Sequence, residues 1–220
     1  MEEPESAQEA IARKLELLVK ENYSQVSFQL QNDYGLPELD PIRHEICYCI
    51  LVGCHQAAIT LTNHLLENAL KTFLIWHDCI HRPTEESYEF SMAKASERYN
   101  GKKLFETIQL MGTKGLITSE QASLINEFRE TFRNAFSHAD KKKTFGSKTM
   151  GIDVLGLVDG RPEIRESQEV NIFDYVPIQG IMQAVRAENE SVYYFSEIDS
   201  LVRSILAKLD QDHKTSRGKV

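Results

Sequence analysis

The residue types most able to do chemistry lie together in one stretch, Glu127 to Lys143, which reads EFRETFRNAFSHADKKK. This stretch contains Arg133, Asn134 and His138, and it closes on Lys141, Lys142 and Lys143. A guanidinium group donates two parallel hydrogen bonds to a phosphate group and stays charged. An imidazole exchanges protons near neutral pH. The stretch therefore predicts a surface that handles phosphate groups.

Cleavage of RNA without a metal ion needs only such groups. A base removes the proton of the ribose 2′-hydroxyl, a cation stabilises the phosphorane, and an acid protonates the leaving oxygen. His138 suits the proton transfers, Arg133 suits the developing charge, and Asn134 suits the orientation of His138 or a phosphate contact. One chain supplies one arginine and one histidine, whereas a symmetric dimer supplies two of each in one cleft. We therefore expect a homodimeric endoribonuclease that cleaves single-stranded RNA by 2′-hydroxyl attack without a cofactor, and in which Arg129 and Lys141 to Lys143 contact the RNA backbone.

The element that must position these side chains is a helix opened by the capping box Thr118-Ser119-Glu120-Gln121. Its apolar stripe comprises Leu124, Ile125, Phe128, Phe132, Ala135 and Phe136. On an α-helix, Asn134 and His138 lie about 40° apart, and Arg133 lies about 140° from His138. Since the stripe faces the core of the chain, Arg133 and Asn134 face solvent or a second chain.

The rest of the chain shows mainly helical periodicity. A helix is predicted from Ser6 to Glu21, and Asp40-Pro41 opens an apolar-periodic stretch to about Cys79, either one helix or two joined near Gly53. Further helices are predicted from Pro83-Thr84, over Lys102 to Met111, over Ile178 to Ala187 and over Val192 to Leu209. The pattern predicts an all-α helical bundle.

Segment 140–176 departs from this pattern, because glycines interrupt it repeatedly. Ile152 to Val158 reads as a strand, Asp159-Gly160 as a tight turn and Ile164 to Phe173 as the returning strand. We therefore expect an irregular segment with a small β-hairpin around 151–172. The whole chain, 1–220, is predicted to be one domain with a flexible acidic N-terminus about 1–6 and a frayed tail over 210–220.

Composition limits the class of protein. Hydrophobic content of 41%, charged content of 26% and 220 residues are ordinary for a soluble globular domain, and a net charge of −8 argues against a general nucleic-acid coat protein. The four cysteines lie in apolar helical segments and are expected to be buried, reduced thiols, and no metal site is predicted. The acidic N-terminus lacks the apolar run of a signal peptide, and no stretch is long enough to cross a bilayer. We expect a cytoplasmic protein with no membrane partner.

The motif Arg133-Asn134-Ala135-Phe136-Ser137-His138 resembles the Arg-x4-6-His motif of the HEPN superfamily, in which a polar residue, often Asn, follows the arginine. The resemblance covers roughly Ile42 to His138 and a C-terminal helix. It implies a helical bundle that dimerises so that two motifs meet, and catalytic roles for Arg133 and His138 with support from Asn134. It also implies metal-independent ribonuclease activity as a toxin or antiviral-defence effector, with a cognate antitoxin or regulatory protein as a partner. One tyrosine-modified subset has Tyr two residues after the histidine, where this chain has Asp140, so its mode of regulation is not implied.

Two other functions fit the same residues. The turn before the motif helix, GLITSEQ, resembles the mannitol-repressor branch, which implies a non-catalytic regulatory or scaffolding protein that acts through protein–protein contacts. A nucleotide-sensing domain with a phosphate ligand at Arg133 is a further alternative. The plainest interpretation is a solvated helix end, where a histidine is favourable next to the helix C-terminus.

Overall fold

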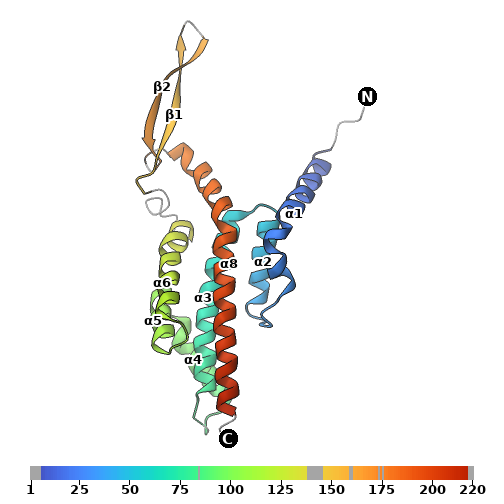
Figure 1. Ribbon diagram of the computed structural model, residues 1–220, viewed down its shortest axis with the longest axis vertical. Helices are drawn as coiled ribbons and strands as arrows, with labels where there is room; N and C mark the ends of the chain where they lie inside the picture. Colours follow the sequence, from blue (N-terminus) through green and yellow to red (C-terminus); the bar gives the residue numbers. More distant parts are fainter. Residues whose placement is uncertain are drawn as a thin grey trace.

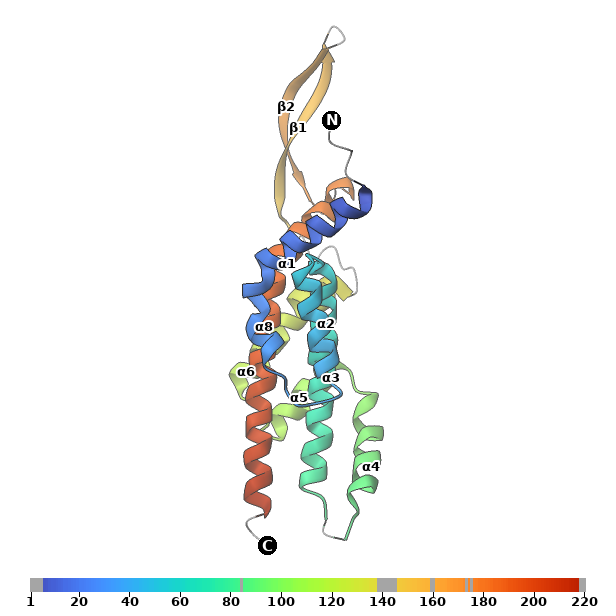
Figure 2. The same ribbon diagram turned by 90° about the vertical axis from the view of Figure 1, so that its right-hand side faces the viewer.

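The computed structural model describes residues 6–83, 85–137, 146–158, 161–172, 174 and 176–217. They form an all-α bundle to which one two-stranded antiparallel sheet is attached (Figures 1 and 2). The elements are α1 (Ala7–Gln31), α2 (Asp40–Leu51), α3 (His55–Ile80), α4 (Tyr88–Asn100), α5 (Leu104–Thr113), α6 (Ser119–Phe128), the π-helix η1 (Arg129–Ser137), β1 (Thr149–Val158), β2 (Arg161–Asn171) and α8 (Val176–Arg217). The predicted fold class is confirmed.

Helices α3 and α8 form the centre of the bundle and run side by side over most of their length (Figure 1). Helix α3 buries apolar side chains on several faces, among them Leu66 and Phe73, and α8 buries Tyr194, Phe195 and Ile205 against it. Burial of one such side chain stabilises the fold by about 1.5–3 kcal/mol. Helices α1 and α2 pack on one flank of this pair, α5 and α6 lie on the other, and α4 packs alongside one end of α3 (Figures 1 and 2).

The side-chain caps at two helix starts agree with the predictions from sequence. Ser6 and Glu9 form a reciprocal capping box at α1, and Thr118 and Gln121 form another at α6. The long apolar stretch is two helices, α2 and α3, because Gly53 adopts a φ of +75° between them, a conformation that other residues avoid. The predicted helix start at Pro83-Thr84 is wrong, because Ser87 caps α4 by accepting from the Phe90 N–H.

The predicted hairpin is confirmed with shifted bounds, because β1 begins at Thr149 rather than Ile152 and β2 runs from Arg161 to Asn171. The predicted turn Asp159-Gly160 and the predicted strand end Phe173 lie outside the described residues. Strands β1 and β2 pair in antiparallel register from Thr149 opposite Asn171 to Val158 opposite Arg161, with one irregularity between Val154 and Leu155. The hairpin extends away from the bundle beyond the first turns of α8 (Figure 1). Helix α8 is continuous from Val176 to Arg217, so the predicted break between Ala187 and Val192 is wrong. The predicted frayed tail, 210–220, is helical as far as Arg217, and residues 218–220 lie outside the described residues.

Two further expectations from the sequence concern the burial of the cysteines and the absence of membrane spans. Cys47 and Cys79 are buried and Cys49 is half-buried, but Cys54 is exposed because it precedes α3 at the turn, so the expectation of four buried thiols is wrong. In the described part of the chain, none of the helices combines the length and the apolar character needed to span a bilayer.

Candidate functional site

The predicted site residues Arg129, Arg133 and Asn134 lie on η1, the π-helical continuation of α6. The widened helix packs through its aromatic side chains: the ring centroids of Phe128 and Phe132 lie 5.1 and 4.2 Å from that of Tyr194 on α8. Short π-helical segments inside α-helices occur frequently at functional sites. This packing fixes η1 against the centre of the bundle, and the sequence stripe centred on Phe128 and Phe132 is confirmed as its core-facing side.

Arg133 is oriented by a carboxylate on α3. Its Nη2 atom lies 3.9 Å from Oε2 of Glu67, and the Arg133 side chain is 30% exposed. Oε1 of Glu67 accepts a hydrogen bond from Lys71 Nζ at 3.2 Å. A separation of 3.9 Å is the outer limit of an ion pair and exceeds a hydrogen bond, so Glu67 attracts the guanidinium without a close bidentate contact.

Asn134 makes its contact within its own helix. Its amide nitrogen donates to Oε2 of Glu130 at 3.0 Å, and Oε1 of Glu130 pairs with Arg129 at 2.8 Å. The Arg129 guanidinium carbon lies 5.4 Å from the centre of the Phe105 ring on α5, a cation–π distance. Arg129 and Arg133 therefore make these contacts on different neighbouring helices, although both were predicted for one surface.

The remaining predicted site residues, His138, Lys141, Lys142 and Lys143, lie outside the described residues. The described chain ends at Ser137 and resumes at Gly146. The predicted contact between Asn134 and His138 therefore stays a prediction. In the described residues, Asn134 is held by Glu130 instead.

A second guanidinium, which the sequence patterns do not single out, lies against η1. Arg186 on α8 donates to the carbonyl oxygen of Thr131 at 3.5 Å, and its guanidinium carbon lies 5.8 Å from the Phe136 ring. Its Nε atom donates to Glu190 at 2.8 Å. A cavity of about 210 Å³ adjoins it, and Lys148, Asn189 and Met182 contribute to the lining. Because Thr131 and Arg186 are 55 residues apart, no local spacing rule relates them.

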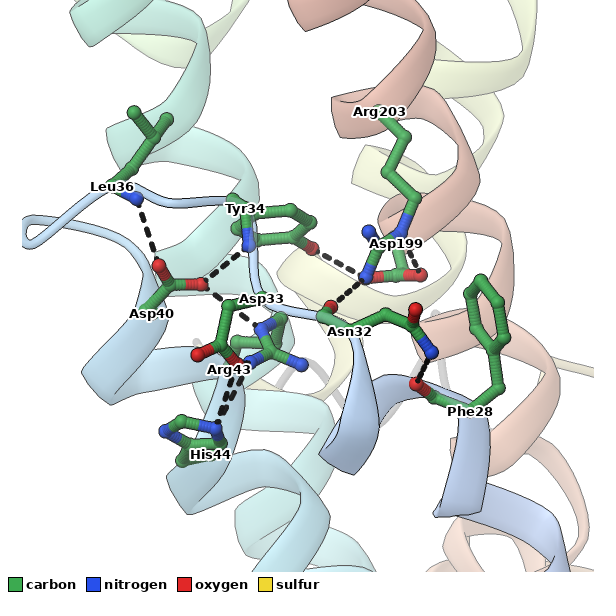
Figure 3. Close-up of polar contacts among 10 residues, drawn as sticks. All are labelled: Phe28, Asn32, Asp33, Tyr34, Leu36, Asp40, Arg43, His44, Asp199 and Arg203. Atoms are coloured by element: carbon green, nitrogen blue, oxygen red, sulfur yellow. Dashed lines mark hydrogen bonds and ion pairs between the residues drawn. The ribbon is translucent and has the colours of Figure 1, made fainter.

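A different polar cluster joins the α1–α2 connection to α8 (Figure 3). The fully buried Arg43 pairs with Asp33 and Asp40, and Tyr34 donates its hydroxyl proton to Asp199 at 2.7 Å. Burial and the neighbouring Asp199 carboxylate raise the pKa of the Tyr34 hydroxyl above its ordinary value.

This cluster is best explained as a structural junction. Asp40 accepts from the backbone N–H groups of Tyr34 and Leu36, each at 2.8 Å, and so fixes the turn that precedes α2. Arg203 on α8 pairs with Asp199 at 2.9 Å and donates to the carbonyl oxygen of Asn32 (Figure 3). The contacts connect backbone and side chains of the same chain, which indicates a role in holding α1, α2 and α8 together.

Metal coordination finds no support in the described residues, since no group of three His, Cys, Asp or Glu side chains there is arranged to hold an ion. Comparisons with protein-family models, curated proteins and solved structures found no match to this chain. The function of this chain is therefore inferred from its residues and their geometry.

Proposed function

We propose that this chain is the protomer of a homodimeric, metal-independent endoribonuclease of the HEPN type that cleaves single-stranded RNA. The observation that carries the proposal is the state of Arg133: half-buried, located on a π-helical segment and attracted by Glu67 from 3.9 Å. A partly exposed ion pair contributes about 0–1 kcal/mol, so the Glu67 contact in itself is a weak competitor for an RNA phosphate group. A guanidinium in contact with that phosphate group stabilises the charge that develops during the reaction.

The reaction follows from the groups that two protomers bring together. One His138 imidazole takes the proton of the ribose 2′-hydroxyl, and the 2′-oxygen attacks the adjacent phosphorus. Arg133 stabilises the phosphorane, the bond from phosphorus to the 5′-oxygen breaks, and the imidazolium of the second protomer protonates that oxygen. The products are a 2′,3′-cyclic phosphate and a free 5′-hydroxyl. No proton or electron is left over, because one imidazole gains the proton that the other loses.

Arg186 is the further residue that we assign to the RNA-contacting surface. It contacts η1 at Thr131 and Phe136 and borders a cavity that Lys148 also lines. Arg186 lies on α8 and Lys148 immediately precedes β1, so the surface combines residues of η1, of α8 and of the start of the hairpin. Such a surface binds the backbone of a single strand through charge, which makes its affinity dependent on salt.

The test is cleavage of a fluorescently labelled single-stranded RNA in the presence of a chelator. The native chain is expected to produce cyclic-phosphate ends, and Arg133→Ala and His138→Ala are each expected to lower the rate by at least about 100-fold. DNA of the same sequence should remain intact, because it lacks the attacking hydroxyl.

Two matched controls separate catalysis from loss of folding. Arg98→Gln and His213→Ala change the same residue types away from η1, on α4 and near the end of α8, and should leave cleavage unchanged. Activity that disappears with the chelator, or that survives in Arg133→Ala, would contradict the proposal.

A second candidate is a non-catalytic regulatory or scaffolding protein of the same type. It is favoured by one observation, namely that Glu67 and Glu130 of the same chain already contact Arg133 and Asn134. In this case RNA stays intact and the His138→Ala variant still binds its protein partner. The chelator-resistant cleavage assay decides between the two candidates.

A further inference from the structure

A cavity of about 310 Å³ lies at the far end of α3, between its last turn, the loop that follows and α4. Figure 2 shows α4 alongside this end of α3. Its lining includes four cations, Arg82, Lys94, Arg98 and Lys114, and two carboxylates, Asp78 and Glu86. The described lining therefore has two positive charges in excess when its histidines are neutral, in a chain whose net charge is −8.

The carboxylates lie deeper than the cations and hold them in place. Asp78 is 17% exposed and accepts from Lys114 Nζ at 2.7 Å, from Arg98 Nη1 at 2.9 Å and from the Tyr99 hydroxyl at 2.7 Å. Burial alone would raise the pKa of Asp78, but the hydrogen bonds from Lys114 and Tyr99 and the charge of Lys114 outweigh it and lower the pKa below the ordinary value. The Asp78 carboxylate therefore stays ionised and orients Arg98 and Lys114 together.

The second carboxylate, Glu86, precedes α4 and orients a cation of that helix, as Asp78 does. Glu86 is 20% exposed and accepts from the Ser91 hydroxyl at 2.7 Å and from Lys94 Nζ at 3.3 Å. The side chains of Lys94 and Arg98 are themselves 55% and 52% exposed. Two preoriented, accessible cations thus line one cavity, and their partner carboxylates lie below them.

Two stacked imidazoles complete the lining. The ring centroids of His77 and His81 lie 4.4 Å apart, and His81 Nδ1 lies 2.9 Å from the carbonyl oxygen of His77. Since a carbonyl oxygen only accepts, His81 Nδ1 is the donor, and the other ring nitrogen, Nε2, is left for a ligand or water. An imidazole in this position adds a hydrogen-bonding group that becomes a cation on protonation.

We propose that this cavity binds the phosphate group of a small phosphate monoester. The group is close to a dianion at neutral pH, which matches the excess of two positive charges. Guanidinium and ammonium groups are its usual partners in proteins. The volume lies at the lower end of the range for small-molecule sites, which fits a phosphate group with a short organic moiety. The site is independent of η1 and of the proposed nuclease activity.

Isothermal titration calorimetry of the full chain at pH 7 and constant ionic strength tests the proposal. The probes are inorganic phosphate, glycerol 3-phosphate, a 5′-phosphorylated dinucleotide and the unphosphorylated dinucleotide. Saturable binding of the first two is expected, with at least tenfold weaker binding to Lys94→Ala and to Lys94→Ala/Arg98→Gln. Binding of the phosphorylated dinucleotide alone would assign the same site to nucleic-acid ends.

The matched control is Lys20→Ala, an exposed lysine on α1, which should bind phosphate like the native chain. Circular dichroism checks the fold of each variant, and Lys94→Ala alone suffices should Arg98→Gln fail to fold, since Lys94 is mainly exposed. Phosphate that binds no better than chloride, or equally well to Lys94→Ala, would overturn the proposal.

Discussion

Arg43 is the residue whose burial has the clearest energetic consequence. Its side chain is inaccessible to solvent, and its two aspartate partners differ in exposure, at 56% for Asp33 and 16% for Asp40. Removing one member of a buried ion pair costs about 3–5 kcal/mol, because the other charge is left uncompensated. Asp40 keeps the two backbone donors of Tyr34 and Leu36, so the lower end of this range applies.

Arg43→Met is therefore expected to lower the free energy of unfolding by about 3 kcal/mol, measured by urea denaturation followed by circular dichroism. Lys20→Met removes a positive charge from an exposed position on α1 and should change stability by less than about 0.5 kcal/mol. A loss below about 1 kcal/mol in the Arg43 variant would mean that the junction of Figure 3 contributes little to folding.

His77 gives the fold a pH dependence. Burial lowers the pKa of its imidazole below the ordinary value, and the hydrogen bond to Asp78 opposes this only in part. Between the folded and unfolded pKa values the unfolded chain binds more protons, so the free energy of unfolding rises with pH. The contribution of neutral His77 to the free energy of unfolding is complete above the unfolded pKa of about 6.5. It is lost as the pH falls through the pKa of His77 in the folded chain.

His77→Gln should accordingly flatten the slope of unfolding free energy against pH between about pH 5 and 7. The measurement is urea denaturation across this interval in buffers without phosphate, because a bound anion would alter the titration. The region below about pH 4 provides the contrast, since Asp78 with its lowered pKa loses its stabilising contacts there in both proteins. An unchanged slope between pH 5 and 7 would exclude His77 as the source.

At the scale of elements, Gly53 separates α2 from α3 through its positive φ of 75°. A side chain there is strained by about 1 kcal/mol regardless of space, although an added Cβ would meet only Leu18 at 3.7 Å. Gly112 in α5 has open space at its Cβ position and no positive φ. Gly53→Ala should therefore destabilise the chain by about 1 kcal/mol, whereas Gly112→Ala should stabilise it by about 0.5–1 kcal/mol. Thermal denaturation of both variants checks the opposite signs, and a neutral Gly53→Ala would contradict the role of this turn.

The elements also show which features sequence patterns can predict. The caps at Ser6 and Thr118 depend on residues three apart, so local spacing predicts them. The continuity of α8 through residues 188–191 depends on packing against α3, and the π-helical backbone of η1 has no counterpart in a periodicity of 3.6 residues. Helix α4 begins after Ser87 and not after Thr84, because Ser and Thr are both favourable N-cap residues and local sequence alone does not select between them.

The candidate site likewise combines residues that the sequence identifies with contacts that only the fold determines. Arg133 and Asn134 are identified by residue type and spacing, and both lie on a helix as expected. The partner of Asn134, Glu130, lies four residues earlier on the same helix. The fold sets the partner of Arg133, Glu67 on α3, and places Arg186 of α8 against η1. Because these last two contacts join residues tens of positions apart, no motif in the chain specifies them.

At the scale of the molecule, the first half of α1 extends beyond the bundle (Figure 1). Ile11, Leu15 and Val19 recur every four residues and are 61%, 41% and 37% exposed, so α1 presents an apolar stripe without a partner in the described part of the chain. Charged residues of both signs lie around the stripe: Glu9, Glu16 and Glu21 against Arg13, Lys14 and Lys20. These six charges cancel, so the described first half of α1 carries no net charge of its own.

The proposed nuclease needs two copies of Arg133 and His138, so its activity and its oligomeric state must change together. Light scattering is expected to give a mass of about 50 kDa, twice the 25.2 kDa of one chain. Ile11→Glu/Leu15→Glu places two charges on the apolar stripe and should shift the mass towards the monomer, whereas Lys14→Ala, on the same helix, should leave the mass unchanged. Activity that persists in a monomeric variant would show that one chain contains a complete site, and cleavage could then not depend on a second imidazole. A native chain that stays monomeric would remove the shared cleft altogether, which leaves the regulatory function as the one consistent with Glu67 and Glu130 holding Arg133 and Asn134.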